Sequence, residues 1–350
     1  MQESPRQRQR DGTSRLRLCI LTPLSILLAG FLVYILFRFS GVSLADIVEG
    51  LLTLPLGSVL AYAALTFASQ MAGARKWQMI VKALGGEQKP SAGYLFYLAS
   101  TTVAGAFSWF LGIQVSSVLV GGLSLKMSGQ GSVTKGAVTA TAMQALHGYV
   151  ILLFLPSALL VMFTDAPAWV WLSLALIVLA VGLGAALHGG ERAARAGLVL
   201  LQRVRWSRVA AIRNGIEQGM ESGIYHPRLL ASLFLLSVVG LSMLAVRNLV
   251  MLTALGIGMG LLRTFAATVI AQSSLVIPLT PGNFGVLEWT WSGLLHALGV
   301  PLDAAARFAI MCRVVTGVSG YATLIISGGL HFAATRLARR RNAAHQVASK

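Results

Sequence analysis

Long apolar runs separated by short polar segments dominate the pattern along the chain. Six of them are long enough to cross a bilayer, over residues 18–39, 54–72, 137–163, 169–188, 229–255 and 304–334. A helix rises about 1.5 Å per residue, so roughly 20 apolar residues span a hydrocarbon core of about 30 Å. The pattern therefore predicts an all-α, polytopic membrane protein with about six full transmembrane helices.

Two further apolar segments, 92–125 and 261–299, do not fit this scheme. Each has a longer arm, a break that contains glycine, and a shorter arm. The short arms, 113–126 and 285–299, reach only about 21–23 Å, which is less than the thickness of the hydrocarbon core. We therefore expect two re-entrant helical hairpins.

The two halves of the membrane region, 18–163 and 164–334, then have the same order of helix, helix, hairpin and helix. The first half begins on the cytoplasmic side of the membrane and the second half begins on the outer side. The pattern therefore predicts an inverted-topology repeat. In transporters of this kind the interrupted segments of the two halves form the substrate site at the repeat interface.

Charge and composition support this assignment. Of 350 residues, 56% are hydrophobic and 11% are charged, whereas a soluble domain carries about 25% charged residues. The formal net charge is +17, but the basic residues lie at the ends of the apolar runs, as the positive-inside rule requires. No RNA-binding aromatic pattern accompanies them, so we expect no nucleic-acid partner.

The same rule predicts the orientation in the cell's inner (plasma) membrane. The basic leader 1–17 and the basic tail 335–350 are expected in the cytoplasm, and Asp165 outside. Segment 191–228 is also expected in the cytoplasm, either as an amphipathic helix on anionic headgroups or as a solvated basic loop. Arg75, Lys76 and Lys82 mark the cytoplasmic end of the run 54–72.

The cysteines suggest no metal or disulfide chemistry. Cys19 and Cys312 both lie in apolar runs, and the sequence has no His–Glu spacing typical of a metal site. We expect neither a metal nor another cofactor.

The break in the second hairpin holds two prolines and two glycines within eight residues: Pro278, Pro281, Gly282 and Gly285. Proline lacks a backbone donor, and glycine permits left-handed backbone. Irregular backbone at membrane depth is tolerated only where protein covers it or where it lines a cavity. The break is therefore either a tight turn or part of a substrate cavity.

Glu288 follows this break into the membrane. An ionised carboxylate is costly there unless it is paired, and the candidate partners are Arg313 and Arg307 in the last helix, with Arg247 as a further basic residue. Such a pair either contacts a substrate or only locks the hairpin to the helix. On the apolar run 137–163, His147 near Gln144 is interpreted as a hydrogen-bonded interior histidine, with a proton relay as the alternative.

The stretch Pro278–Glu288, the segment Ala297-Leu298-Gly299-Val300 and Arg313 together resemble the lysylphosphatidylglycerol synthase transmembrane-region, or flippase-like, family. Its members typically show P-x-x-P-G-G-x-G-x-x-E, then A-L-G-V, then an arginine in the following helix. Asn283 stands where the second glycine is usual. The similarity covers 229–329 well, and 75–84 weakly, which adds Arg75 as a weaker site candidate.

The resemblance implies transfer of a lipid between leaflets, in some members a lysylated phosphatidylglycerol. It gives substrate-path roles to Pro278, Pro281, Gly282, Gly285, Glu288 and Arg313. The first half departs from the family, because neutral residues such as Gln114 and Gln144 stand where charges are usual. The soluble aminoacyl-transfer domain of the synthase is absent from the sequence.

The sequence thus favours a lipid flippase or lipid-transport protein that moves an anionic or aminoacylated envelope lipid, and not an enzyme. A membrane-embedded lipid or glycosyl transferase is the alternative, although it needs acidic or nucleophilic groups in a cavity and the membrane region offers only Glu288. An accessory subunit of an envelope-lipid enzyme is a third class. Besides membrane lipids, the candidate partners are such an enzyme or a second copy of the chain.

Overall fold

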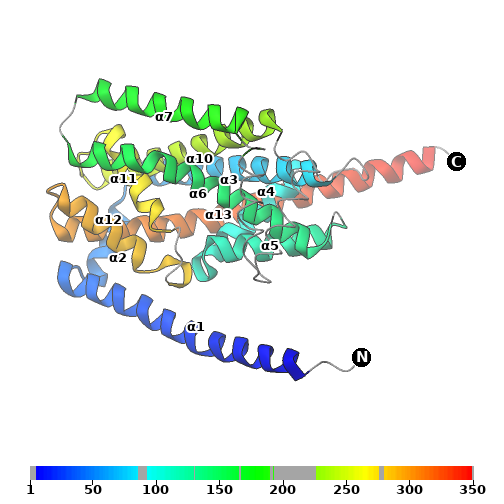
Figure 1. Ribbon diagram of the computed structural model, residues 1–350, viewed down its shortest axis with the longest axis horizontal. Helices are drawn as coiled ribbons and strands as arrows, with labels where there is room; N and C mark the ends of the chain where they lie inside the picture. The colour runs from blue at the N-terminus through cyan, green and yellow to red at the C-terminus, as the bar shows by residue number, and fades with distance from the viewer. Residues whose placement is uncertain are drawn as a thin grey trace.

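The computed structural model describes residues 5–85, 93–129, 131–164, 167–189, 192, 226–275 and 280–348. Within these ranges the chain forms helices and loops (Figure 1): α1 (Pro5–Ser40), α2 (Leu44–Thr53), α3 (Leu56–Gly85), α4 (Tyr94–Leu111), α5 (Ile113–Met127), α6 (Val133–Phe163), α7 (Ala168–His188), α10 (Pro227–Ala254), α11 (Leu261–Ser273), the short 3₁₀ helix η1 (Pro281–Asn283), α12 (Val286–Ala297) and α13 (Leu302–Ala348). The prediction of an all-α polytopic membrane protein is confirmed.

Six of the described helices are long and apolar enough to cross a membrane, namely α1, α4, α6, α7, α10 and α13. The number agrees with the prediction, but the membership differs at two places. The helix α4 qualifies by itself, although it was expected to be one arm of a hairpin. The run 54–72 qualifies only when α2 and α3 are counted as one bent pair, because polar residues such as Ser69 and Gln70 lower its hydropathy.

The bend between α2 and α3 measures 92°. The helix α2, which was not predicted from the sequence, begins after Ser43: the Ser43 side chain accepts the Asp46 N–H, and the Asp46 side chain accepts the Ser43 N–H. Pro55 disfavours helical backbone at the residue before it, and Leu54 is extended. The chain therefore turns sharply into α3.

The first interrupted segment is α4 followed directly by α5, with Gly112 between them at φ 77°. The second is α11, then a break, η1 and α12. The second arms have 15 residues in α5 and 12 residues in α12, and both are too short to cross a bilayer as single helices. Pro278 lies in 276–279, outside the described residues.

Packing partners repeat between the two halves of the chain. The central pair is α3 against α10, and α4 packs on α13 as α11 packs on α6. In the same way α5 packs on α6 and α12 on α13. This pattern matches a repeat in which α3–α6 correspond to α10–α13. The long helices α1 and α7 lie on opposite outer sides of the bundle (Figure 1).

In Figure 1, α1 begins and α13 ends at the same end of the bundle. The segment 191–228, expected to be either an amphipathic helix or a solvated basic loop, falls outside the described residues, apart from residue 192 and residues 226–228. Asp165, expected on the outer side, also lies outside them.

Candidate functional site: a polar cavity between two broken helices

Glu288 is buried in the first turn of α12, directly after the break. Its Oε2 accepts the backbone N–H of Gly285 at 2.8 Å. A carboxylate at this position satisfies an otherwise unpaired N–H and interacts favourably with the positive end of the helix dipole. Glu288 therefore stabilises the start of α12 in addition to its charge pairing.

The partner of Glu288 is Arg313 of α13. The distance from Arg313 Nε to Glu288 Oε1 is 3.4 Å, and the side chains are 13% and 5% exposed. Arg313 also donates a hydrogen bond to the carbonyl oxygen of Gly282. Its guanidinium carbon lies 4.1 Å from the ring centroid of Phe284 and 5.4 Å from that of Trp109, within the range of a cation–π interaction. Arg313 thus joins α13 to both breaks.

The alternative partner, Arg307, lies elsewhere. Its Nη2 is 3.6 Å from Asp303 Oδ2 on the same helix, and both side chains are about half exposed, at 45% and 48%. Such exposed pairs contribute little to stability. Arg75 is also outside the site: it is exposed, and its Nη1 donates to Gln78 Oε1 at 2.6 Å.

The two breaks contact each other. Gly282, Asn283 and Gly285 have φ values of 60°, 55° and 82°. A Cβ atom on Gly282 would overlap the carbonyl oxygen of Trp109 in the last turn of α4, next to the first break, and one on Gly285 would overlap Leu32 of α1. Both positions therefore require glycine for space as well as for conformation.

Asn283 is the one non-glycine residue with positive φ in the described part of the chain. Asparagine tolerates left-handed backbone better than most residues, which explains how it can stand where the family has glycine. Its Oδ1 is buried and has no hydrogen-bond partner. An unpaired buried oxygen is costly.

A cavity of about 320 Å³ lies beside the contact between the breaks. Residues from both halves line it, and its polar members include Tyr62, Ser69, Ser108, Gln114, Gln144, His147, Arg247, Asn248, Gln272, Asn283, Arg313 and Thr316. Thus α13 and the breaks bring Arg313 and Asn283 together with Arg247 of α10 and with Gln144 and His147 of α6.

Arg247 has few partners for its charge. Its Nη1 donates to Thr66 Oγ1 at 3.3 Å, and its guanidinium carbon lies 4.8 Å from the ring centroid of Tyr62. Its Nε has no partner, and neither does Nδ1 of His147. Among the described residues that line this cavity there is no Asp or Glu. The cavity therefore suits an anionic group better than acid–base chemistry that depends on carboxylates.

Three lining or neighbouring residues were not recognised as site candidates from the sequence. Tyr62 and Trp109 contact Arg247 and Arg313, which lie far away in the chain, so no local signal marks them. Lys76 was expected only to mark the cytoplasmic end of the run 54–72. It is buried, at 7% exposed, and lines a second cavity that adjoins the first. The sequence did not identify this role because a lysine beside an apolar run can lie at the membrane surface or point into the bundle.

These features define a class of protein: an α-helical membrane protein whose two broken helices meet beside a polar, cationic cavity. The sequence profile of the lysylphosphatidylglycerol synthase TM region matches residues 24–323, and the chain belongs to that family. No curated protein matches the chain. Membership extends over the main body of the chain and identifies a membrane protein concerned with envelope lipids.

Proposed function

We propose that the protein moves an anionic phospholipid between the leaflets of the plasma membrane, with its headgroup in the cavity between the breaks. The observation that carries the proposal is the lining of this cavity, which holds Arg247 and Arg313 and, among the described residues, no Asp or Glu. Glu288, the partner of Arg313, is not part of that lining and leaves Arg247 without a counter-charge in the cavity. A lipid phosphate supplies the missing negative charge, because arginine binds phosphate oxygens through its planar set of N–H donors.

A flippase must also leave room for the acyl chains, and a groove between α5 and α6 has the required character. It has a volume of about 740 Å³ and is lined largely by Val115, Val118, Leu119, Ala145, Tyr149 and Leu152. Gln114, Gln144 and Gly148 line both this groove and the polar cavity. A lipid can therefore place its headgroup among polar residues while its chains remain in an apolar environment.

The glycines of α5 and α6 explain why the groove opens where it does. A Cβ atom on Gly136 would overlap the carbonyl oxygen of Gly121, so the helices are in close contact near their connection. Further along, Gln144 Nε2 donates to Ser117 Oγ at 3.1 Å. The groove continues from there along Gln114 and Gly148, where a Cβ atom on Gly148 would meet nothing within 4 Å.

The substitution Gly148→Leu tests this route. A Cβ atom at this position meets nothing within 4 Å, so we expect the protein to fold. The leucine side chain would fill the junction between groove and cavity and slow transport by at least about tenfold, which is about 1.4 kcal/mol in the barrier. The purified protein is reconstituted in vesicles with fluorescent phosphatidylglycerol, and a membrane-impermeant reductant bleaches the outer leaflet. The measurement is the rate at which the inner-leaflet lipid becomes accessible to this reductant.

The matched control is Gly184→Leu on the outer helix α7, where a Cβ atom also meets nothing within 4 Å. It should transport at the wild-type rate. If Gly148→Leu folds and transports as fast as Gly184→Leu, the α5–α6 groove is not the route of the acyl chains.

A further inference from the structure

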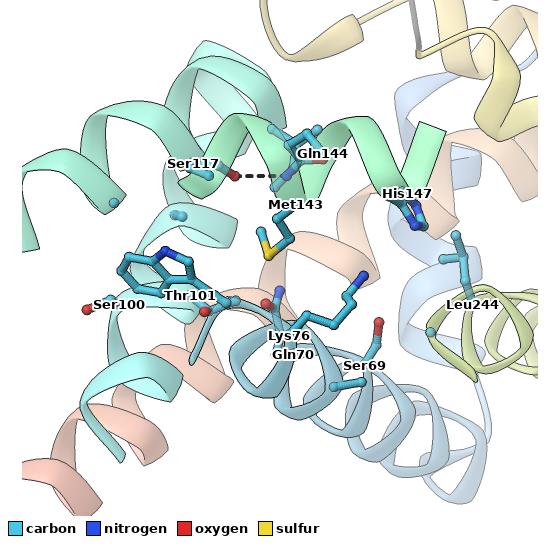
Figure 2. A pocket seen from close by; sticks show the side chains of 18 residues that line it. Ser69, Gln70, Lys76, Ser100, Thr101, Ser117, Met143, Gln144, His147 and Leu244 are labelled. Carbon is cyan, nitrogen blue, oxygen red and sulfur yellow. Dashed lines mark hydrogen bonds between the residues drawn. The ribbon is translucent and has the colours of Figure 1, made fainter. Parts of the chain in front are cut away.

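Lys76 lies in a cavity of about 190 Å³ between α3, α4, α5, α6 and α10. Figure 2 shows its side chain extending into the space between Ser69, Met143 and His147, with the hydrogen bond from Gln144 to Ser117 on the opposite wall. Lys76 is buried, and α3 continues for nine residues beyond it to Gly85. The ammonium group is therefore well inside the bundle.

The charge of Lys76 has no counter-charge among the described residues. Its Nζ donates to Ser237 Oγ of α10 at 3.2 Å, and the cavity lining has no Asp or Glu in the part of the chain that the structure describes. An ammonium group has more N–H donors than this one acceptor uses. A buried charge without a partner is destabilising, and a bound anion would compensate it.

The remaining polar lining fits a phosphate group. It is neutral apart from the lysine and offers hydroxyl and amide donors, from Ser69, Gln70, Ser100, Thr101, Ser117 and Gln144. These groups can donate hydrogen bonds to phosphate oxygens without adding negative charge.

The Lys76 cavity adjoins the polar cavity, because both are lined by Ser69, Ile113, Gln144, His147 and Leu244. On α3, Tyr62, Ser69 and Lys76 are seven residues apart and so lie on one face. On α10, ten residues separate Ser237, next to Lys76, from Arg247, a rise of about 15 Å. The two cavities thus form one polar path along the contact of α3 with α10, with a cation near each end.

We propose that the Lys76 cavity is a second anion site, which binds the phosphodiester group of an anionic phospholipid at a different depth from Arg247. The proposal rests on the proposed function, since it makes the two cations successive positions of one headgroup. By the predicted orientation, Lys76 is the position nearer the cytoplasm and Arg247 the position nearer the outside.

The test uses the full-length purified protein in a zwitterionic detergent. Thermal unfolding is measured without additive, with dioleoyl phosphatidylglycerol and with inorganic phosphate. The variants are Lys76→Met, which removes the charge, and Lys76→Gln, which retains a donor for Ser237. The control is Lys82→Met, an exposed lysine on the same helix.

Without additive, both Lys76 variants should unfold at a higher temperature than the wild type, because an uncompensated buried charge has been removed. Their apparent affinity for phosphatidylglycerol should fall by at least about tenfold, as expected for loss of a charge-assisted contact. Lys82→Met should match the wild type. A wild-type response to phosphatidylglycerol alone identifies a lipid headgroup as the ligand, and a response to inorganic phosphate as well identifies a free anion.

The proposal is wrong if the Lys76 variants keep the wild-type response to both additives. It is also wrong if the wild type responds to neither and the variants unfold at a lower temperature, because Lys76 then only stabilises the packing. The protein could also bind lipid in a way that depends on Lys76 and yet show no transport. That result would support the anion site and contradict the proposed flippase function, so failure of one proposal can be distinguished from failure of the other.

Discussion

Glu288→Gln is expected to abolish lipid transport and to lower the free energy of unfolding by about 3–5 kcal/mol, because Arg313 is left buried without its counter-charge. Glutamine retains an oxygen that can accept the Gly285 N–H. The loss of stability is therefore due to the missing charge and not to a missing helix cap. Arg313→Gln should cost at least as much, since it also removes the hydrogen bond to the Gly282 carbonyl. Stability is measured by unfolding in detergent, and transport in vesicles.

The exposed pair formed by Arg307 and Asp303 provides the control. Arg307→Gln should change stability by less than about 1 kcal/mol and leave transport unchanged. If Glu288→Gln and Arg313→Gln both transport lipid at the wild-type rate, the pair has no part in the mechanism.

A double variant separates a structural role of the pair from substrate contact. Glu288→Leu with Arg313→Met removes both charges and keeps similar volumes, so the protein should recover most of its stability. We expect this protein to fold and remain inactive, because Arg313 lines the proposed headgroup cavity. Recovery of transport together with stability would show that the pair only locks α12 to α13.

Gly282→Ala should separate the two breaks and eliminate transport. Alanine at φ 60° is strained, and its Cβ would overlap the carbonyl oxygen of Trp109. The strain costs about 1–2 kcal/mol, and the overlap adds about 1–3 kcal/mol if the first break has to move. Stability and transport of the variant are measured as for Glu288→Gln.

Gly299→Ala is the matched control for this prediction. Gly299 follows α12 at φ 86°, and a Cβ atom there meets nothing within 4 Å. The variant should therefore lose only the stability that the backbone strain costs, and it should retain transport. Equal losses of stability in the two variants would mean that the contact with Trp109 is not needed to hold the breaks together.

Much of the helical architecture could be predicted because its signals are local. The lengths of the apolar runs predicted most of the long helices, and the break at Gly112 separates α4 from α5 as expected. The helices that were not predicted correctly also differ for local reasons. Ser43 and Asp46 form a capping box whose helix was not recognised, and Ser69 and Gln70 reduce the hydropathy of α3 below that of a single span.

The site could be predicted only in part, because its geometry depends on contacts between distant segments. The cost of a lone charge in the membrane indicated that Glu288 has a basic partner and left Arg313 and Arg307 as candidates, and the resemblance to the family favoured Arg313. Trp109 and Tyr62 carry no such signal, and their positions beside Arg313 and Arg247 follow from the packing of α4 and α3. For Lys76, the sequence could not distinguish a lysine at a membrane surface from one that points into the bundle.

Transport by the wild-type protein in vesicles tests the proposed function most directly. The full chain is reconstituted with phosphatidylglycerol or phosphatidylcholine that carries a fluorophore on an acyl chain, and a membrane-impermeant reductant bleaches the outer leaflet. We predict that the protein makes inner-leaflet phosphatidylglycerol accessible to the reductant faster than phosphatidylcholine, and faster than in protein-free vesicles. If phosphatidylglycerol remains as protected as in protein-free vesicles, both with and without an imposed proton gradient, the protein is not a flippase for this lipid class.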